Sequence, residues 1–257
     1  MALTEAELER HARHIVLRGI GGPGVRKLRA ARVLVVGAGG LGSPALLYLA
    51  AAGVGTLGIC DPDTVSLSNL QRQVLHGTAD LGRPKTDSAA EALGRLDPGV
   101  RIEAHPVALD PANADALIGA YDLVLDGTDG FEVRALVNAV CARLRRPLIA
   151  AALGAWEGQL GTFKPWEGGP CWACLFPERP APGLSPPCAE VGVLGALAGV
   201  MGALQAAEAV KEITGAGEGL TGRLILWDAW SAEMRVVRTA KRPDCAVCAG
   251  IGPGVES

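Results

Sequence analysis

Two pairs of cysteines have the spacing of metal ligands. Cys171 and Cys174 enclose two residues in CWAC, and Cys245 and Cys248 do so in CAVC. Four thiolates suit a tetrahedral zinc ion, because each CxxC pair supplies two adjacent corners of the tetrahedron. Four protein ligands leave no open position for a substrate, so we expect a structural zinc site. Disulfides are the alternative, which the odd count of seven cysteines does not favour.

The three other cysteines differ in their surroundings. Cys60 lies in an apolar predicted strand and Cys141 in a predicted helix, so we expect both in the core. Cys188 lies in the proline-rich segment SPPCAEVGV, just before an apolar predicted helix. A helix N-terminus lowers the pKa of a thiol, so Cys188 is a candidate nucleophile, and a plain loop residue is the alternative.

A glycine-rich turn joins a predicted strand to a predicted helix. Gly37, Gly39 and Gly42 form GxGxxG within residues 31–61, whose pattern predicts a strand, a helix and a second strand. The glycines permit a close approach of the backbone to phosphate, and the helix N-terminus adds partial positive charge. The turn therefore predicts a nucleotide site; a turn of purely packing origin is the alternative.

Polar side chains follow the second of these strands. Asp61 ends it, where a carboxylate usually bonds the ribose hydroxyls of NAD or of ATP. The loop DTVSLSNLQRQ then supplies Asn69 and Arg72, and Lys85 follows in GRPKTD. Cations that converge on a strand end suit a triphosphate, so we expect ATP, although a solvated surface role is the alternative for each cation alone. Further candidates for this nucleotide site in the same loop are Asp63, Ser68, Leu70 and Gln71.

Two aspartates end a further predicted strand, in LVLDGTD. A carboxylate facing a polyphosphate makes physical sense where magnesium lies between them, because the ion offsets their repulsion. We therefore expect Asp126 and Asp129 near a magnesium ion, with Asp129 as the main candidate. The alternative for Asp129 is the N-cap of the helix that follows.

The composition excludes several classes of protein. A formal net charge of −3 provides no basic surface for nucleic acid. The longest apolar run, Val191–Leu204, is shorter than the roughly 18 residues that indicate a membrane span. Residues 4–14 are charged, unlike a signal peptide, and Thr4 and Glu7 have the spacing of a helix capping box. We therefore expect a cytoplasmic protein that binds neither nucleic acid nor membrane.

Strands and helices alternate over the first half of the chain. This pattern predicts an α/β fold, a doubly wound, Rossmann-like and mostly parallel sheet with ligands at the carboxyl ends of its strands. We expect residues 1–257 to form a single domain, with a nucleotide-binding core over about 31–150 and a β-rich C-terminal lobe with the zinc site over about 151–257. In that lobe we expect hairpin strands over 156–177, a helix from Val191 and two antiparallel strands over 222–241.

These motifs, in this order, resemble the MoeB/ThiF/HesA family of bacterial relatives of ubiquitin-activating enzymes. The resemblance runs from about Glu9 to Cys248 and includes GAGGLG, DPDTVSLSNLQRQ, GRPKTDSA, DLVLDGTDG and the two CxxC pairs. It is closest to the molybdopterin-synthase adenylyltransferase branch. It implies ATP-dependent adenylation of the C-terminal glycine carboxylate of a small ubiquitin-like sulfur-carrier protein of the MoaD/ThiS type, with release of pyrophosphate.

The resemblance also implies roles for particular residues. It assigns Gly40, Asp61, Asn69, Arg72 and Lys85 to ATP and Asp129 to magnesium, and Arg13 would reach the phosphates of the neighbouring subunit in a homodimer. Cys188 matches a crossover-loop cysteine that links covalently to the carrier in some members. Gly130 departs from the family's usual asparagine. The chain ends soon after Cys248, so we expect a separate sulfur donor such as a cysteine desulfurase or a rhodanese.

Three alternatives to this function stay open at the level of sequence. The glycine turn and Asp61 would also suit an NAD(P)-dependent oxidoreductase, but the sequence offers no acid for hydride transfer. A non-catalytic scaffold subunit is the second alternative, although Arg72, Lys85 and Asp129 are all present. The third is a related family member that adenylates a small molecule or a tRNA base.

Overall fold

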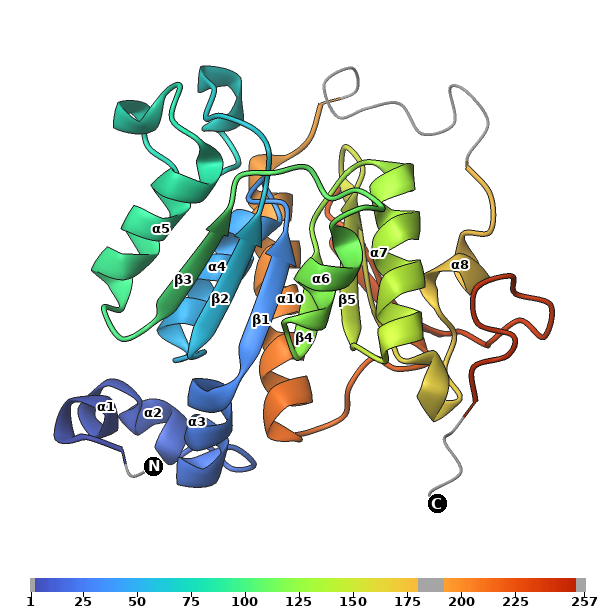
Figure 1. Cartoon of the computed structure of the whole chain (residues 1–257), viewed down its shortest axis with the longest axis horizontal. Coiled ribbons are helices and arrows are strands. Elements are labelled where there is room, and N and C mark those ends of the chain that lie inside the picture. Colours follow the sequence, from blue (N-terminus) through green and yellow to red (C-terminus); the bar gives the residue numbers. More distant parts are fainter. Residues whose placement is uncertain (1–2, 180–191, 253–257) are drawn as a thin grey trace.

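The structure is built around one sheet with the strand order β3-β2-β1-β4-β5-β6-β7-β8 (Figure 1). This computed structural model describes residues 3–179 and 192–252. Strands β1 to β5 run parallel, and β6, β7 and β8 add antiparallel pairs at one side. The strands are β1 Arg32–Val36, β2 Thr56–Cys60, β3 Arg101–His105, β4 Leu123–Asp126, β5 Leu148–Leu153, β6 Glu157–Phe163, β7 Arg223–Asp228 and β8 Glu233–Arg238.

Helices cover both faces of this sheet (Figure 1). The helices are α1 Glu5–Arg10, α2 Ala12–Ile15, α3 Gly21–Ala30, α4 Gly42–Ala51, α5 Lys85–Leu96, α6 Ala114–Gly119, α7 Phe131–Leu144, α8 Trp172–Leu175 and α10 Gly195–Thr214. Short 3-10 turns lie at η1 Leu67–Asn69, η2 Thr78–Asp80 and η3 Pro165–Glu167. The α/β fold with a mostly parallel sheet is therefore as the sequence predicts.

The core consists of two apolar layers, because successive side chains of a strand point to opposite faces. In β1, Val33 and Val35 pack on one face, in a buried cluster that also contains side chains of α4, α5 and α10. Leu34 and Val36 pack on the other face, with side chains of α6, α7 and α8. Every residue of β2 is buried, as expected of an inner parallel strand.

The C-terminal half departs from its prediction in one segment. The predicted hairpin over residues 156–177 is wrong: this segment contributes one strand, β6, which pairs with β5 on one side and β7 on the other. After η3 the chain forms the single helical turn α8 across the first cysteine pair. Proline and glycine turns mimic a hairpin within this segment, whereas β6 pairs with β5, which directly precedes it, and with β7, which lies far along the chain. The predicted pair β7–β8 is confirmed.

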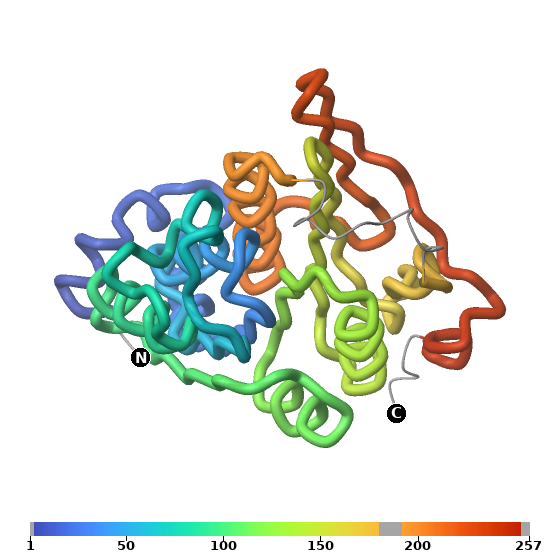
Figure 2. The backbone as a smooth tube through the Cα atoms, turned by 90° about the horizontal axis from the view of Figure 1, so that it is seen from above, coloured from blue at the N-terminus to red at the C-terminus, as the bar shows by residue number. Residues whose placement is uncertain are grey.

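The apolar helix α10 also begins later than expected. It starts at Gly195, and Val191 lies outside the described residues. Seen from above, α10 lies between the N-terminal part of the chain and strand β6 (Figure 2), and it packs against α3, α4, β5 and β6. Among the described helices, none is both long and apolar enough to span a bilayer.

The N-terminal helices lie at the end of the sheet opposite the loops that follow the parallel strands (Figure 1). The predicted capping box is confirmed: Thr4 Oγ1 accepts from the backbone N–H of Glu7, and the Glu7 carboxylate accepts from the backbone N–H of Thr4. The side chains of α2 are therefore presented far from the carboxyl ends of the strands.

Candidate active site

A cavity of about 700 Å³ opens at the carboxyl ends of the parallel strands. Its walls come from the glycine turn, the loop after β2, the start of α5, the loop after β4 and the adjoining ends of β5 and β6. The sequence candidates that line it are Gly37, Gly39, Gly40, Asp61, Asp63, Asn69, Arg72, Lys85 and Asp129. The fold thus gathers, in one cavity, residues that are widely separated in the sequence.

The motif glycines do two different things. Gly37 has a positive φ of 94°, and a Cβ on Gly42 would lie 1.8 Å from the Gly37 carbonyl oxygen, so these two glycines build the turn. At Gly39 the nearest neighbour of such a Cβ is the Gln73 amide nitrogen at 3.6 Å. Packing alone therefore does not require glycine at Gly39. Open backbone facing a cavity is what a phosphate group needs.

Asp61 stabilises this turn through hydrogen bonds from the backbone. Its Oδ2 accepts from the backbone N–H of Ala38 at 2.8 Å, and its Oδ1 accepts from the backbone N–H of Asp63 at 2.9 Å. Each carboxylate oxygen keeps a second lone pair, so Asp61 can still accept from a ribose hydroxyl. The ribose contact stays a prediction, and the structure adds a second role in shaping the turn.

His76 holds the same turn from the other side. Its Nε2 lies 3.0 Å from the carbonyl oxygen of Ala38, and its Nδ1 lies 2.8 Å from Oγ of Ser88. These contacts suit a neutral ring that donates from Nε2 to Ala38 and accepts from the Ser88 hydroxyl at Nδ1. Burial lowers the pKa of His76, and the nearby Lys85 cation acts in the same direction. Sequence reasoning missed this residue.

Lys85 is a buried cation at the start of α5. Its side chain is only 6% exposed, and its Nζ lies 2.7 Å from Oδ2 of Asp63 and 3.8 Å from Oδ2 of Asp61. A buried ammonium group needs a counter-ion. The Asp63 side chain is 64% exposed, so it can turn into water when a phosphate group takes over the charge of Lys85.

Arg72 lies along the glycine turn. A Cβ on Gly40 would meet the Arg72 side chain at 3.4 Å, and Nη1 of Arg72 donates to the carbonyl oxygen of Ser68 at 3.2 Å. Three other candidates from this loop do not line the cavity: Ser68, Leu70 and Gln71. Gln71 packs on the start of α10 instead, because a Cβ on Gly195 would lie 2.3 Å from its carbonyl oxygen.

The two aspartates after β4 separate into two roles. Asp126 is 1% exposed, and its Oδ1 accepts from the backbone N–H and the hydroxyl of Thr128. Asp129 is exposed and lines the cavity. The alternative N-cap role of Asp129 is wrong, because Gly130 occupies the N-cap position of α7 and provides no side-chain cap. Of these two aspartates, Asp129 is therefore the one that a metal ion in the cavity would meet.

Other residues of the cavity wall have no signal in the sequence. Gln73 is 4% exposed, and its side-chain oxygen has no hydrogen-bond partner among the described residues. It is the last residue of the loop DTVSLSNLQRQ, and its residue type alone does not mark it as part of a site. Arg134 looks like an ordinary cation of an amphipathic helix. Trp172 stands between the first two cysteines, and its ring packs 5.2 Å from that of Phe131 and 5.1 Å from that of Phe176.

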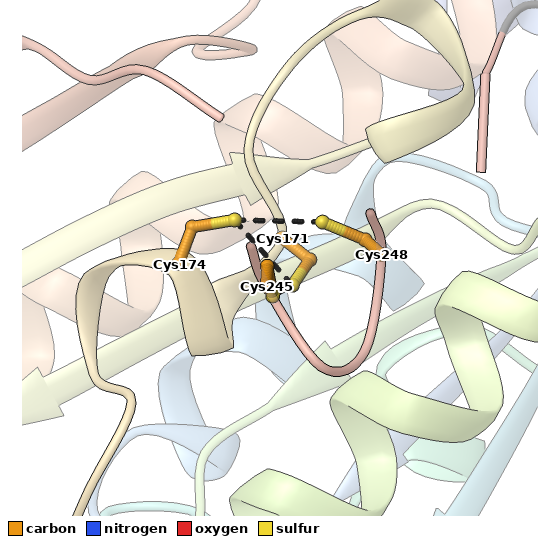
Figure 3. A group of neighbouring side chains, drawn as sticks. All are labelled: Cys171, Cys174, Cys245 and Cys248. Carbon is orange, nitrogen blue, oxygen red and sulfur yellow. Dashed lines mark hydrogen bonds between the residues drawn. The ribbon is translucent and has the colours of Figure 1, made fainter. Parts of the chain in front are cut away.

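The four cysteines of the CxxC pairs converge (Figure 3). All four are buried, and their sulfur atoms lie within 4.8 Å of one another. Three separations are 3.9 Å for Cys171–Cys174, 3.6 Å for Cys171–Cys245 and 3.4 Å for Cys174–Cys248. Tetrahedral zinc with Zn–S bonds of about 2.3 Å places sulfurs about 3.8 Å apart. The residues present therefore fit a four-thiolate metal site, and disulfide bonds are far shorter than these separations.

The surroundings of the cluster shift the pKa of its cysteines in different directions. Burial raises the pKa of Cys245, but hydrogen bonds to its sulfur from the backbone N–H groups of Cys248 and Val247 outweigh this, so that its pKa falls to about 7. Burial raises the pKa of Cys171, and that of Cys248 to about 11. Asn138 of α7 joins the cluster to the core: it donates to the Cys171 sulfur at 3.7 Å and accepts from the Trp172 backbone N–H at 2.8 Å.

The remaining candidates lie elsewhere. Cys60 and Cys141 are core residues as predicted, since burial raises the pKa of Cys60 to about 11 and that of Cys141 further. Arg13 is exposed on α2, at the opposite end of the sheet from the cavity. Cys188 lies outside the described residues, so its role as a nucleophile stays a prediction.

Comparisons with known proteins cover nearly the whole chain. The ThiF family model matches residues 11–247. The sulfur carrier protein adenylyltransferase of Thermus thermophilus is 46% identical over 252 residues, which cover 96% of this chain and 93% of that protein. The SAMP-activating enzyme E1 of Haloferax volcanii is 45% identical and matched over 100% of this chain and 94% of its own.

Two further likenesses are partial. The probable adenylyltransferase/sulfurtransferase MoeZ of Mycobacterium tuberculosis is 46% identical over 94% of this chain, but the match spans only 62% of MoeZ. A crystal structure of Escherichia coli MccB with ATP superposes with a TM-score of 0.81 at 22% identity, covering 94% of this chain and 75% of that one. At that level of identity the likeness concerns the fold.

Proposed function

The chain belongs to the ThiF family, and on this premise we propose that it adenylates the C-terminal glycine carboxylate of a small ubiquitin-like sulfur-carrier protein. A carboxylate oxygen attacks the α-phosphorus of ATP, the bond to the β-phosphate bridge breaks, and pyrophosphate leaves. The observation that carries this proposal is the cavity, which brings the cations Arg72 and Lys85 to an open glycine turn. Relatives named as adenylyltransferases support it over nearly the full chain.

The side chains of the cavity act by charge rather than by proton transfer. Negative charge builds up on the phosphoryl oxygens in the transition state, and Arg72 and Lys85 would stabilise it. The attacking carboxylate is already ionised at neutral pH, so a general base is not required. This agrees with the described lining of the cavity, which contains no histidine; His76, which contacts the glycine turn, is hydrogen-bonded to Ala38 and Ser88.

Asp129 is the proposed ligand of magnesium. It is exposed within the cavity, and within the described residues its carboxylate makes no hydrogen bond or ion pair that would compete with an ion. Magnesium binds carboxylate and phosphate oxygens together, and when bound it offsets the charge of the polyphosphate. Asp129 would then hold the metal-bound nucleotide against the turn.

The four-cysteine cluster is the proposed zinc site. Its ligand set, burial and sulfur separations suit a closed tetrahedral ion. The cluster joins two segments far apart in the chain, one around α8 and one near the C-terminal end of the described residues. Zinc there would hold the last segment against α8 and Asn138, a structural role.

A homodimer would explain Arg13. This residue is exposed on α2, far from the cavity of its own chain, so only a second copy could bring it to a nucleotide. Next to α2, Val16 is 77% exposed and Leu17 is 52% exposed, and such apolar side chains suit a subunit contact. We therefore propose that Arg13 reaches the active site of the neighbouring subunit in a homodimer.

The carrier would dock on the β7–β8 side of the sheet. Trp230 is 75% exposed and packs edge-on to Trp156, while Met234 and Val236 of β8 are about half exposed. Trp156 follows shortly after Leu153, which lines the cavity, so we expect this apolar surface to lie near the site. Trp230→Ala should raise the KM for the carrier severalfold and leave the KM for ATP unchanged.

Sulfur would come from a separate donor protein in the cytoplasm. All six cysteines of the described part of the chain are buried, and the one that lines the cavity, Cys60, has a pKa raised to about 11. Neither property suits a persulfide carrier, which needs an accessible thiolate.

Pyrophosphate exchange tests the proposed reaction. We expect labelled pyrophosphate to enter ATP when the protein, magnesium and a carrier ending in Gly-Gly are present. A carrier without its last glycine is the matched control and should give no exchange. Exchange that needs no carrier, or that a small carboxylic acid or a tRNA supports equally, would contradict the proposed substrate.

A further inference from the structure

Arg134 is a buried cation in the wall of the cavity. It is 8% exposed, lies on α7 and lines the cavity. Among the described residues no carboxylate forms an ion pair with its guanidinium group. A buried charge without a counter-ion is costly, so such a side chain is expected to have a specific task.

The Arg134 guanidinium instead binds two backbone carbonyl groups. Its Nη2 donates to the carbonyl oxygen of Thr128 and, at 2.8 Å, to that of Ala151. Thr128 lies in the loop after β4, and Ala151 lies in β5. Arg134 therefore ties the loop that carries Asp129 to the neighbouring strand.

Thr128 is held from its other side by Asp126. The Asp126 carboxylate accepts from the Thr128 backbone N–H at 2.9 Å and from its hydroxyl at 2.8 Å. Thr128 is thus held by two buried side chains, the carboxylate of Asp126 and the guanidinium group of Arg134. The side chain of the next residue, Asp129, has no such restraint among the described residues.

The fixed loop also touches the glycine turn. A Cβ on Gly37 would lie 3.3 Å from the carbonyl group of Gly127, and the Gly127 backbone N–H donates to Val36 at 3.0 Å. Any displacement of Thr128 would therefore change the distance between Asp129 and the phosphate-binding backbone.

We propose that Arg134 is a positioning residue, which holds the Thr128 carbonyl and thereby sets the Asp129 carboxylate at the distance from the phosphates that a bridging magnesium ion requires. This inference rests on the proposed function. Both hydrogen bonds come from Nη2, whose two N–H bonds lie in the plane of the rigid guanidinium group and therefore point in fixed directions, unlike those of a freely rotating lysine ammonium group. Arg134 acts through Asp129 and need not touch the nucleotide.

The test compares the affinity for ATP with and without magnesium, measured by titration calorimetry. Magnesium should tighten ATP binding to the wild-type protein. In Arg134→Gln and in the milder Arg134→Lys, the factor by which magnesium increases ATP affinity should be about tenfold smaller than in the wild-type protein. A change of this size is typical of residues that orient a metal ligand. Affinity for metal-free ATP should stay within about twofold of wild type. Arg143→Gln, on the exposed side of the same helix, should behave as wild type.

A double variant separates positioning from a merely structural role. In an Asp129→Ala background, Arg134→Gln should change the magnesium gain no further, because its effect passes through Asp129. Equal loss of affinity with and without magnesium, or additive loss in the double variant, would overturn the inference. Failure of the wild-type protein to bind ATP would overturn the proposed function itself, and this inference with it.

Discussion

Polar or ionisable side chains build two sites in this molecule: the cavity at the carboxyl ends of the strands and the four-cysteine cluster. The two sites differ in how far their side chains are exposed to solvent. The cavity is open, and its carboxylate Asp129 and counter-ion Asp63 are exposed. The cluster is closed, and its four sulfurs are buried among one another. One region keeps groups available for a ligand that arrives and leaves, whereas the other has no room for exchange.

This difference indicates which substitutions should affect activity and which should affect stability. Changes to the exposed polar side chains of the cavity, such as Asp129, should cost activity without unfolding the protein, because these side chains contribute little packing. Changes in the cluster should cost stability first. Helix α7 lies between them: Arg134 and Asn138, one turn apart, reach the cavity loop and the cluster respectively.

The largest effect expected is the loss of exchange in Asp129→Ala. Because this carboxylate is exposed and has no partner among the described residues, its removal should leave the melting temperature within about 2 °C of wild type. The exchange rate should fall about a thousandfold, or about 4 kcal/mol in transition-state stabilisation. Exchange at the wild-type rate would remove Asp129 from the mechanism.

Loss of the metal should come next, and should act on stability. We expect one zinc ion per chain by elemental analysis, and Cys248→Ser or prolonged chelation should lower the free energy of unfolding by about 3 kcal/mol. Cys141→Ala, which removes a core thiol outside the cluster, should keep the full zinc content. A metal-free protein that melts like the native one would contradict a structural zinc site.

A pair of glycine variants sharpens the comparison at the glycine turn, where Gly39 lines the cavity and Gly42 does not. Gly42→Ala should destabilise the fold by about 2 kcal/mol, because its Cβ would lie 1.8 Å from the Gly37 carbonyl oxygen. Gly39→Ala has room for the methyl group and should melt as wild type, yet lose about tenfold in ATP affinity by calorimetry. Equal ATP affinity in Gly39→Ala and wild type would show that the turn serves packing alone.

The smallest effect concerns pH. Because burial lowers the pKa of His76, the neutral ring contributes stability that is present above about pH 6.5 and is lost as the pH falls through the lower folded-state value. His76→Gln cannot titrate, so its melting temperature should fall less than that of wild type between about pH 7 and about pH 5. His11 titrates in both proteins, and so their difference isolates His76. Parallel pH curves for the two proteins would contradict this role.

Much of the fold could be predicted because its signals are local. The β-branched strand at Val33–Val36, the glycine turn and the alternation of strands and helices each depend on short-range sequence. The segment 156–177 was mispredicted because β6 pairs with strands that lie outside it, and no local pattern reports a partner such as β7.

The parts of the candidate site that could be predicted are those in which the residue types alone indicate which ligand they bind. Four cysteines in two pairs, or a lysine and an arginine after a strand, indicate ligands by themselves. Arg134 could not be found this way, because its task depends on the carbonyl groups of Thr128 and Ala151, which only the fold brings to it. Asp126 and Asp129 look alike in sequence, and only burial separates them.

Titration of the pure zinc-loaded protein with Mg-ATP tests most directly whether this cavity is a nucleotide site. The account predicts saturable heat with one ATP bound per chain, abolished when Lys85 is replaced by alanine in a protein that still folds. Absence of heat from the wild-type protein, or undiminished binding in Lys85→Ala, would contradict it.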